Sequence, residues 1–312
     1  MQHLSGLITA CYTPMHADTS LNLDMIEPLA ERCIQDEVAG VFICGATGEF
    51  ASLSVAERIS IAERWRAATA DRLKLIVHVG GTCLSDCQHL AKHAAKIGAD
   101  GISAIAPYFY KPATLEVLVD FCAVVSGAAS HLPFYYYHLP PLSGVDFPMF
   151  DFLQRGADRI AGLAGIKYSN TDLMDMGRCV NFDGGRFNIL FGVDEMLLSG
   201  LVLGSPGAVG TSYSFAAGLY NRIIEAFKSG DMATARQQQG RSMELLAIGR
   251  RYGGHRGMKQ IMKMIGLDCG PIRLPWRPLS VMEYDTMHTE LDAIGFWEYC
   301  SQPEKVSTGA SH

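Results

Sequence analysis

The first two thirds of the chain alternate between short apolar segments and longer stretches in which apolar residues recur with a helical period. Most of the short segments are apolar at nearly every position rather than at every second one. Continuous apolar runs of this length are typical of parallel strands that are covered on both faces. The segments predicted to be strands are 7–12, 38–44, 75–79, 100–106, 133–138, 164–169, 187–192 and 207–210.

The stretches between these strands are predicted to be helices. Ser54 and Glu57 have the spacing of a capping box, Gly98 is a C-cap signal, and Thr171 is expected to open a helix. After residue 216 only helical patterns remain, through about residue 297. The helices expected before that point span about 23–35, 54–68, 84–97, 114–126, 148–154, 171–180 and 195–203.

Eight strand–helix units in about 215 residues have the number and size of a (β/α)8 TIM barrel, an α/β fold. The alternative is a doubly wound open sheet. Its nucleotide-binding versions lose support because no Gly-x-Gly-x-x-Gly follows the first strand and the chain has no phosphate loop. We therefore predict a barrel over residues 1–216, C-terminal helices packed on it over 217–300, and a flexible polar tail over 301–312.

Composition narrows the class of function. The chain has 312 residues, 48% hydrophobic and 19% charged, with a net charge of −6 and a pI near 5.9. This balance argues against nucleic acid and anionic membranes as partners. No apolar run reaches the roughly 18–20 residues of a membrane helix, and the N-terminus lacks the pattern of a signal peptide.

Nine cysteines are scattered without a pairing pattern, several of them inside apolar segments. This usage predicts reduced, mostly buried thiols and a cytoplasmic protein. One cluster, Cys83, Cys87, His89 and His93, has the residue types of a zinc site. On a helix the two cysteines share one face and the two histidines another, so the four cannot converge and we predict no metal.

The candidate chemistry centres on Lys167, in the middle of the apolar strand 164–169. Burial disfavours the charged ammonium, and a lysine that is neutral near pH 7 is a nucleophile toward carbonyl carbon. The alternative is a strand-end lysine whose head reaches solvent. In the preceding strand Tyr137 is predicted to handle protons, although three consecutive tyrosines also suit strand packing.

Strand alternation predicts which side chains face the barrel interior. If Lys167 points inward, Gly165 does so too, and we expect that glycine to leave room beside the ammonium. Tyr135 and Tyr137 should share one face while Tyr136 takes the other.

Further polar residues fall at predicted strand ends, where barrels of this kind carry their functional groups. The turn 45–49 can present backbone N–H groups to a carboxylate, or it is an ordinary tight turn. Asp194 and Glu195 are candidate site residues, or an acidic pair at a helix N-terminus. The residues at these ends are Thr47, Tyr108, Tyr110, Tyr137, Lys167, Asp194, Glu195 and Thr211.

Three motifs together carry a family resemblance: Gly45-x-Thr47-Gly48-Glu49, Tyr137-x-x-Pro140 and Gly165-Ile166-Lys167. From Leu7 to about Pro278 the chain resembles the class I pyruvate aldolases, the family of the N-acetylneuraminate lyases and dihydrodipicolinate synthases. The resemblance implies a barrel with C-terminal helices, usually a homotetramer, and no metal or organic cofactor.

The resemblance also implies residue roles. Lys167 would be the Schiff-base lysine and Tyr137 the proton-handling phenol, while Thr47 and the Ala46 and Thr47 amides would hold the pyruvate carboxylate. Leu142 stands where the synthases place an arginine, which favours the lyase branch. The residues that would contact the polyol end of the substrate are Ser169, Gly192, Asp194, Glu195 and Thr211.

The implied activity is that of a carbon–carbon lyase that cleaves N-acetylneuraminate reversibly to N-acetylmannosamine and pyruvate. Ala46 and Phe109 replace hydroxyl-bearing residues that many members have, and Ala46 removes a hydrogen bond worth roughly 0.5–1.5 kcal/mol. An aldolase or hydro-lyase acting on another sugar-derived 2-keto acid through the same imine is therefore the alternative. The intact pair of Lys167 and Tyr137 argues against a non-catalytic binding protein.

Overall fold

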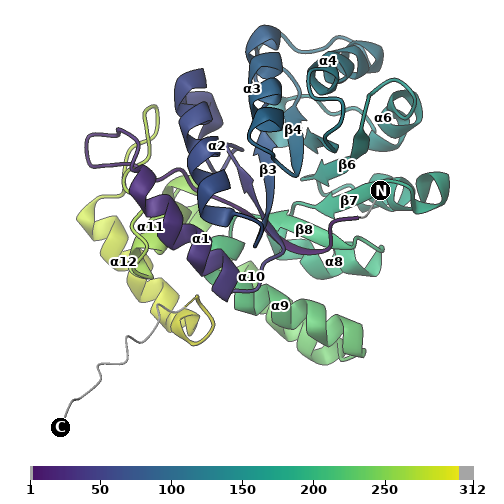
Figure 1. Cartoon of the computed structure of the whole chain (residues 1–312). Coiled ribbons are helices and arrows are strands. Elements are labelled where there is room, and N and C mark those ends of the chain that lie inside the picture. Colours follow the sequence, from purple (N-terminus) through teal and green to yellow (C-terminus); the bar gives the residue numbers. More distant parts are fainter. Residues whose placement is uncertain (1–2, 302–312) are drawn as a thin grey trace.

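Eight parallel strands form a closed barrel with helices around it (Figure 1). The computed structural model describes residues 3–301, so the predicted tail lies almost entirely outside the described residues. Each strand pairs with the next, and β1 pairs with β8 to close the barrel. This confirms the predicted (β/α)8 barrel. The strands are β1 Gly6–Ala10, β2 Gly40–Ile43, β3 Lys74–His78, β4 Gly101–Ile105, β5 Phe134–His138, β6 Leu163–Tyr168, β7 Asn188–Phe191 and β8 Gly207–Gly210.

Most strands are shorter than predicted, although each of the eight predicted segments overlaps a strand. At the end of β2 the reason is visible, because Cys44 has φ 53° and turns the chain out of the sheet. Its side chain stays buried, as do those of Cys11 and Tyr12 beyond β1. Apolar character therefore continues past the last paired residue into the loops at this end of the barrel.

The helices of the barrel follow the prediction with small shifts, except that the short helix α5 was not predicted. The capping box of Ser54 and Glu57 is present at the start of α2. Thr171 does not open a helix: Asp172 is the N-cap of α7 and accepts a hydrogen bond from the backbone N–H of Asp175 at 3.0 Å. The barrel helices are α1 Ile26–Gln35, α2 Val55–Thr69, α3 Leu84–Lys96, α4 Leu115–Gly127, α5 Pro140–Ser143, α6 Met149–Gly156, α7 Leu173–Asn181 and α8 Leu197–Val202.

Two of the predicted helices begin with a 3-10 turn. The segment predicted at 23–35 begins with the turn Leu23–Met25, and the one predicted at 195–203 begins with the turn Asp194–Met196 before α8.

Helices continue after the eighth strand and gather on one side of the barrel, beside α1 (Figure 1). The first of them passes through the boundary predicted at residues 216 and 217, and its backbone is non-helical at Ala216. The division into a barrel and an extension stays a prediction. These helices are α9 Tyr213–Ser229, α10 Met232–Arg251, α11 His255–Met264 and α12 Val281–Ala293.

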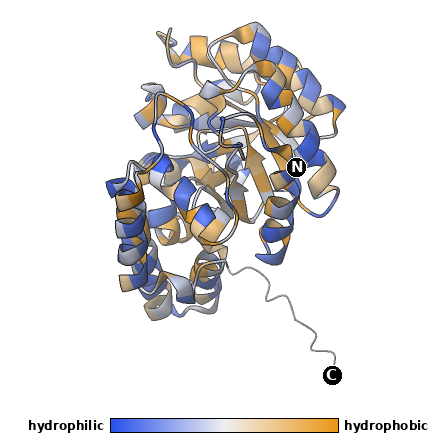
Figure 2. Cartoon of the chain, turned by 90° about the vertical axis from the view of Figure 1, so that its left-hand side faces the viewer, coloured by the Kyte–Doolittle hydropathy of each residue, from blue (hydrophilic) through white to orange (hydrophobic). Residues whose placement is uncertain are grey.

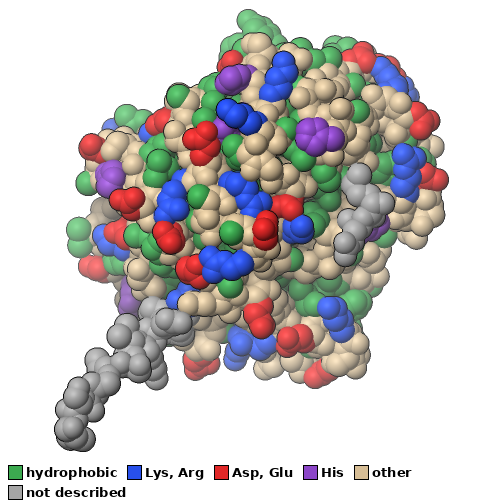
Figure 3. All heavy atoms as spheres, in the orientation of Figure 1, with side chains coloured by type: hydrophobic (Ala, Val, Ile, Leu, Met, Phe, Trp, Pro, Cys, Tyr) green, Lys and Arg blue, Asp and Glu red, His purple; other side chains and the backbone are tan. Residues whose placement is uncertain are grey.

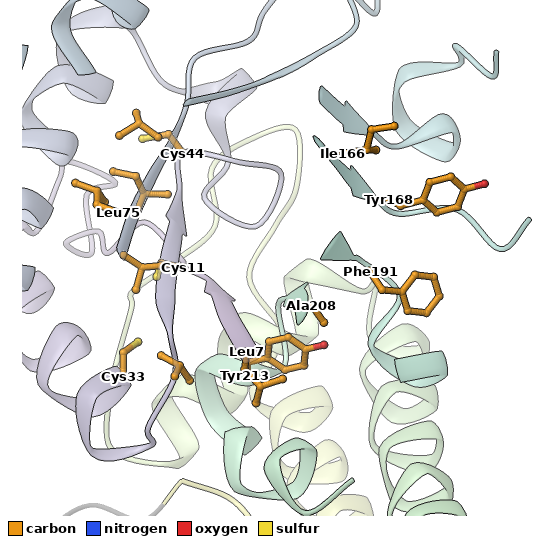
Figure 4. Packing of buried hydrophobic residues seen from close by; sticks show 14 of the residues in the cluster. Leu7, Cys11, Cys33, Cys44, Leu75, Ile166, Tyr168, Phe191, Ala208 and Tyr213 are labelled. Carbon is orange, nitrogen blue, oxygen red and sulfur yellow. The ribbon is translucent and has the colours of Figure 1, made fainter. Parts of the chain in front are cut away.

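Apolar side chains form two clusters, one inside the barrel and one between the strands and the helices. Strand alternation separates them: Ile166 and Tyr168 belong to the outer cluster, and Tyr168 points the same way as Phe191 of the next strand (Figure 4). Tyr135 and Tyr137 belong to the inner cluster and Tyr136 to the outer one, as predicted. The strands are accordingly mainly hydrophobic, whereas the outer helices mix both kinds of residue (Figure 2).

The surface carries no concentrated charge on the face shown in Figure 3, where acidic and basic side chains are interspersed. Within residues 3–301 no helix is long and apolar enough to cross a membrane, and no group of three or more potential metal ligands comes together. Eight of the nine cysteines are buried, Cys83 being the exception.

Candidate active site

Lys167 lies inside the barrel, on the inward face of β6. Its Nζ is 4.0 Å from the ring centroid of Phe42 and 4.0 Å from that of Tyr137, and the residue is 4% exposed. Burial lowers the pKa of Lys167 to about 7, and the Asp194 carboxylate opposes this shift. The lysine is therefore partly neutral at neutral pH, and its head does not reach solvent.

Gly165 serves a purpose different from the predicted one. A Cβ at this position would lie 1.9 Å from the backbone oxygen of Asn188 in β7. The glycine is thus required for the close approach of β6 to β7, and the expectation that it leaves room beside the ammonium is wrong. The sequence of one strand cannot reveal this constraint, because it comes from the neighbouring strand.

Tyr137 lies against Lys167 at the end of β5. Its ring meets those of Phe42 and His78 edge-on, with centroid distances of 5.6 and 5.7 Å. Burial raises the pKa of Tyr137, the Asp194 carboxylate raises it further, and a hydrogen bond with Ser169 lowers it. The phenol therefore keeps its proton at neutral pH and can donate it.

The loop after β2 lies beside the loop after β8. The hydroxyl oxygens of Thr47 and Thr211 are 2.6 Å apart and share a hydrogen bond. Among the residues that the structure describes, no acceptor lies within hydrogen-bond distance of the Ala46 and Thr47 amides. Two free N–H groups and a hydroxyl are suited to receive a carboxylate.

A polar cavity of about 270 Å³ opens beside these groups. The predicted polyol contacts all line it: Ser169, Gly192, Asp194, Glu195 and Thr211. At Gly192 a Cβ would lie 2.0 Å from the hydroxyl oxygen of Ser169, so only glycine leaves that hydroxyl its place at the cavity wall.

Asp194 is fixed from two sides. Its Oδ2 accepts hydrogen bonds from the backbone N–H of Ser212 at 2.9 Å and from the Ser212 hydroxyl at 2.5 Å. A Cβ at Gly210 would lie 2.3 Å from Oδ1. Burial raises the pKa of Asp194, while the Ser212 hydrogen bonds and the nearby lysine lower it. The carboxylate is thus a fixed acceptor at the cavity wall.

Glu195 forms an ion pair with Arg250 of α10, which also lines the cavity. Asp194 and Glu195 also begin the 3-10 turn that precedes α8. The acidic pair therefore lies both at the cavity and at a helix N-terminus, and these are the two interpretations that the sequence left open.

Sequence reasoning missed Phe42, His78 and Lys259. Phe42 lies at an inward position of β2 and has room because a Cβ at Gly45 would be 2.5 Å from its ring. Period-two alternation along β2 was the signal that could have found it. His78 was the one polar residue in an otherwise apolar strand, and it is fully buried against the rings of Phe50 and Tyr137.

Lys259 of α11 is 1% exposed and anchors residues 45–49 after β2, which we call the carboxylate loop. Its Nζ donates hydrogen bonds to Glu49 Oε1 at 2.7 Å and to the backbone oxygens of Thr13 and Pro271 at 3.0 and 2.9 Å. Glu49 Oε2 accepts from the backbone N–H of Arg273 at 3.0 Å. No sequence signal pointed to this lysine, because charged residues are common on surface helices.

These groups suit nucleophilic attack on a carbonyl. A partly neutral lysine touches a protonated phenol, free amides stand ready for an adjacent carboxylate, and a polar cavity can hold hydroxyl groups. Within the described chain the site offers no cluster of metal ligands.

Comparison with known proteins agrees with this geometry. The profile of the dihydrodipicolinate synthetase family matches residues 3–294. The N-acetylneuraminate lyase of Homo sapiens is 40% identical over 301 residues, covering 95% of this chain and 94% of that protein. The N-acetylneuraminate lyase of Danio rerio is 41% identical over 286 residues, covering 90% of this chain and 93% of that protein.

Solved structures are similar over nearly the whole chain. The N-acetylneuraminate lyase of Proteus mirabilis has a TM-score of 0.92 at 36% identity and covers 95% of this chain and 100% of that one. The sialic acid aldolase of Aliivibrio salmonicida has a TM-score of 0.92 at 38% identity, with 95% and 98% covered.

Proposed function

The chain belongs to the dihydrodipicolinate synthetase family, and on that premise we propose that it is a class I aldolase that cleaves N-acetylneuraminate reversibly to N-acetylmannosamine and pyruvate. The observation that carries the proposal is the position of Lys167, buried against the rings of Phe42 and Tyr137 with its pKa lowered to about 7. We take N-acetylneuraminate as the substrate because the similar proteins include N-acetylneuraminate lyases.

The reaction begins at Lys167. The lone pair of neutral Nζ attacks the C2 ketone of the open-chain sugar acid, and loss of water gives a protonated imine. The substrate carboxylate is held by Thr47 and the free Ala46 and Thr47 amides, which places C2 at the lysine. The imine nitrogen then lies against two aromatic faces, which favour its positive charge.

Bond cleavage requires a proton to leave the C4 hydroxyl. The C3–C4 electron pair moves into the imine as an enamine forms, and N-acetylmannosamine departs as the aldehyde. Tyr137 is the proton carrier because it is the phenol in contact with Lys167: it gives its proton to the water that leaves during imine formation, and the resulting phenolate takes up the C4 hydroxyl proton through the substrate carboxylate. Protonation of the enamine at C3 and hydrolysis of the imine release pyruvate and regenerate the lysine.

The polar cavity supports a polyol as the second half of the substrate. Ser169, Asp194, Glu195 and Thr211 offer it hydroxyl and carboxylate partners. A sugar hydroxyl can donate to a carboxylate and accept from a hydroxyl. Leu142, where the synthases have an arginine, leaves no cation at that position for a second carboxylate.

Ala46 motivates a second candidate, an aldolase or hydro-lyase acting on another sugar-derived 2-keto acid through the same imine. The side chain at this position lacks a hydroxyl beside the carboxylate loop, which removes one partner from the proton relay. Cleavage assays with a panel of 2-keto acids that differ in chain length and stereochemistry separate the two candidates.

We further propose a cytoplasmic homotetramer. Phe109 and Tyr110, in the loop after β4, are 74% and 87% exposed in the single chain. Adjacent exposed aromatic side chains are typical of interfaces between subunits. Light scattering should give four times the chain mass, and the double variant Phe109→Ser/Tyr110→Ser should give a smaller species. A monomeric wild-type protein would contradict this assembly.

The imine is tested by mixing the protein with N-acetylneuraminate and borohydride, followed by intact mass and peptide mapping. A reduced adduct of pyruvate size on Lys167 would support both imine formation and cleavage. An adduct of whole-sugar size would mean that the imine forms without cleavage. An adduct with pyruvate but none with the sugar acid would favour the second candidate. Lys167→Met should give no adduct, and no adduct on the wild-type protein would contradict the role of Lys167.

A further inference from the structure

A chain of buried hydroxyl groups leads away from Asp194, the carboxylate at the wall of the polar cavity. Its first member is Ser212, just before α9, whose hydroxyl donates to Asp194 Oδ2 at 2.5 Å. Its second member is Tyr220 of α9, whose phenol oxygen lies 2.7 Å from the Ser212 hydroxyl oxygen. Ser212 and Tyr220 are fully buried and do not line the cavity, so neither can touch a ligand that occupies it.

The direction of these hydrogen bonds follows from the number of protons. A carboxylate can only accept, so the single hydroxyl proton of Ser212 belongs to Asp194. The Ser212 oxygen then accepts from Tyr220, and the phenol has to be the donor. Burial raises the pKa of Tyr220, so the phenol keeps the proton that it donates. The chain therefore runs in one direction, from Tyr220 through Ser212 to Asp194.

A second arm holds the backbone of Asp194. Nε2 of Gln239, on α10, donates to the backbone oxygen of Asp194 at 3.3 Å and to the Ser242 hydroxyl at 2.5 Å. Oε1 of Gln239 accepts from the backbone N–H of Leu198 at 2.8 Å. Ser242 is also a hydrogen-bond partner of Tyr220, so the two arms meet on α10.

Hydrogen bonds are needed to hold this carboxylate in one orientation. The last side-chain torsion of an aspartate has only broad minima, so the carboxylate turns easily when nothing restrains it. In this structure the Ser212 hydroxyl and the Ser212 backbone N–H both bond to Oδ2, which fixes the rotation. Tyr220 in turn fixes the Ser212 hydroxyl, because it takes the position from which another proton could reach that oxygen.

We propose that Tyr220 is a positioning residue for the sugar half of the substrate: acting through Ser212, it holds the Asp194 carboxylate in the orientation that accepts a hydroxyl of the polyol. The inference rests on the proposed function, in which Asp194 contacts the polyol, and adds to it a residue outside the cavity. Tyr220 touches no substrate atom and takes no part in proton transfer.

The test uses the condensation of pyruvate with N-acetylmannosamine, because this direction gives a separate KM for each half of the substrate. Tyr220→Phe keeps the ring and removes the donor. The KM for N-acetylmannosamine should rise about three- to tenfold, the range for one hydrogen bond. The KM for pyruvate should stay within twofold, because Lys167 and the carboxylate loop are not part of the chain.

Ser212→Ala makes the same comparison without changing the ring, and it should raise the KM for N-acetylmannosamine at least as much. Adding Tyr220→Phe to Ser212→Ala should have no further effect, because Tyr220 acts through Ser212. A further rise in the double variant, equal to that of Tyr220→Phe alone, would contradict the chain.

Tyr213→Phe is the matched control. Tyr213 lies on the same helix, is equally buried and meets the Tyr220 ring edge-on at a centroid distance of 4.7 Å. Its hydroxyl has no hydrogen-bond partner among the described residues, so removing it should leave both KM values within twofold.

Two outcomes would overturn the inference while the proposed function stands. One is a Tyr220→Phe enzyme with the wild-type KM for N-acetylmannosamine. The other is an equal rise in both KM values, which would indicate a general loosening of the site. A wild-type protein that forms no N-acetylneuraminate from these two substrates contradicts the proposed function, and the inference falls with it.

Discussion

The reactivity that we propose for Lys167 rests on its burial, which makes its pH dependence predictable. Because burial lowers the pKa of Lys167 to about 7, the neutral nucleophile is scarce below that pH and abundant above it. We expect kcat/KM to rise about tenfold per pH unit below pH 7 and to level off above it. Steady-state kinetics from pH 5.5 to 8.5 check this, and a profile that rises only near pH 10 would show that the lysine is not desolvated.

The same burial should make the lysine destabilising. Between pH 7 and 10.5 the unfolded chain holds a proton on Lys167 that the folded chain does not, so the stability of the wild-type protein rises with pH across this window. Lys167→Met removes the penalty, and we expect it to be more stable than the wild type by roughly 3–5 kcal/mol at pH 6.5.

The stability difference for Lys167→Met should shrink as the pH approaches 10. Thermal midpoints of both proteins at pH 6.5 and 9.5 measure it. Lys259→Met is an informative comparison, since it also replaces a buried lysine but removes a paired charge, and it should be less stable than the wild type. A less stable Lys167→Met would contradict the argument.

At the residue scale, the sequence could predict that Lys167 and Tyr137 lie together inside the barrel, because Lys167 interrupts an apolar strand and Tyr137 is near the end of the strand before it. It could not explain Gly165, which depends on a contact between strands, and alternation along β2 could place Phe42 inside the barrel but not against Lys167. Ser212 was missed for a similar reason: its bonds to Asp194 join the ends of β7 and β8, which only the closed barrel brings together.

At the scale of elements, the loop after β2 depends on helix α11. Lys259 of α11 pairs with Glu49, the last residue of the Gly-x-Thr-Gly-Glu turn, and both are almost fully buried. Removing one partner of a buried pair leaves the other charge uncompensated. Lys259→Met should therefore cost about 3–5 kcal/mol of stability and raise the KM for pyruvate, because the loop that carries Thr47 loosens.

A double-mutant cycle tests this coupling. Glu49→Gln combined with Lys259→Met should cost less than the sum of the two single changes, since neither charge is then left alone. Lys263→Met is the control: Lys263 pairs with Asp268 at 3.5 Å, both about half exposed, and its loss should cost less than about 1 kcal/mol. Urea unfolding and pyruvate kinetics on the four proteins of the cycle and on the control provide the measurements. Additive costs of the two single changes would contradict a coupled pair.

Apart from the short helix α5, the existence and order of the barrel elements followed from periodicity, and their ends did not. Cys11, Tyr12 and Cys44 are apolar and buried but lie beyond the last paired residue of their strands, so hydrophobicity alone extends the prediction too far. The helix at 171–180 was predicted one residue early because Thr171 and Asp172 are both plausible caps, and only the hydrogen bond to Asp175 distinguishes them.

At the scale of the whole molecule, the C-terminal helices complete the site. Lys259 and His255 reach it from α11, and Arg250 and Gln239 reach it from α10, where Gln239 donates to the backbone oxygen of Asp194 at 3.3 Å. The sequence predicted that these helices exist. It could not predict which of their polar residues face the barrel, because a buried lysine such as Lys259 cannot be told from a surface lysine in the sequence.

Three buried imidazoles make the whole fold sensitive to acid. Burial lowers the pKa of His78 well below its usual value, that of His138 to about 3 and that of His255 to about 4. In the unfolded chain each titrates near 6.5. Below that pH the unfolded state binds protons that the folded state does not, so stability falls as the pH falls from 6.5 toward 4.

We expect this loss to begin well above the range in which carboxylates titrate. Burial of Asp194 raises its pKa and acts in the opposite sense, whereas hydrogen bonds and the charge of Arg273 hold the pKa of Glu57 at about 2.

At pH 5.5 the unfolded state should therefore take up about three more protons per chain than the folded state, one for each buried imidazole. Unfolding the protein in urea in weakly buffered solution and titrating back to pH 5.5 counts them directly. His255→Gln should reduce the uptake by about one proton. An uptake near zero would mean that water reaches these imidazoles in the folded protein, and the barrel interior around His78 would then be wetter than its packing against Phe50 and Tyr137 implies.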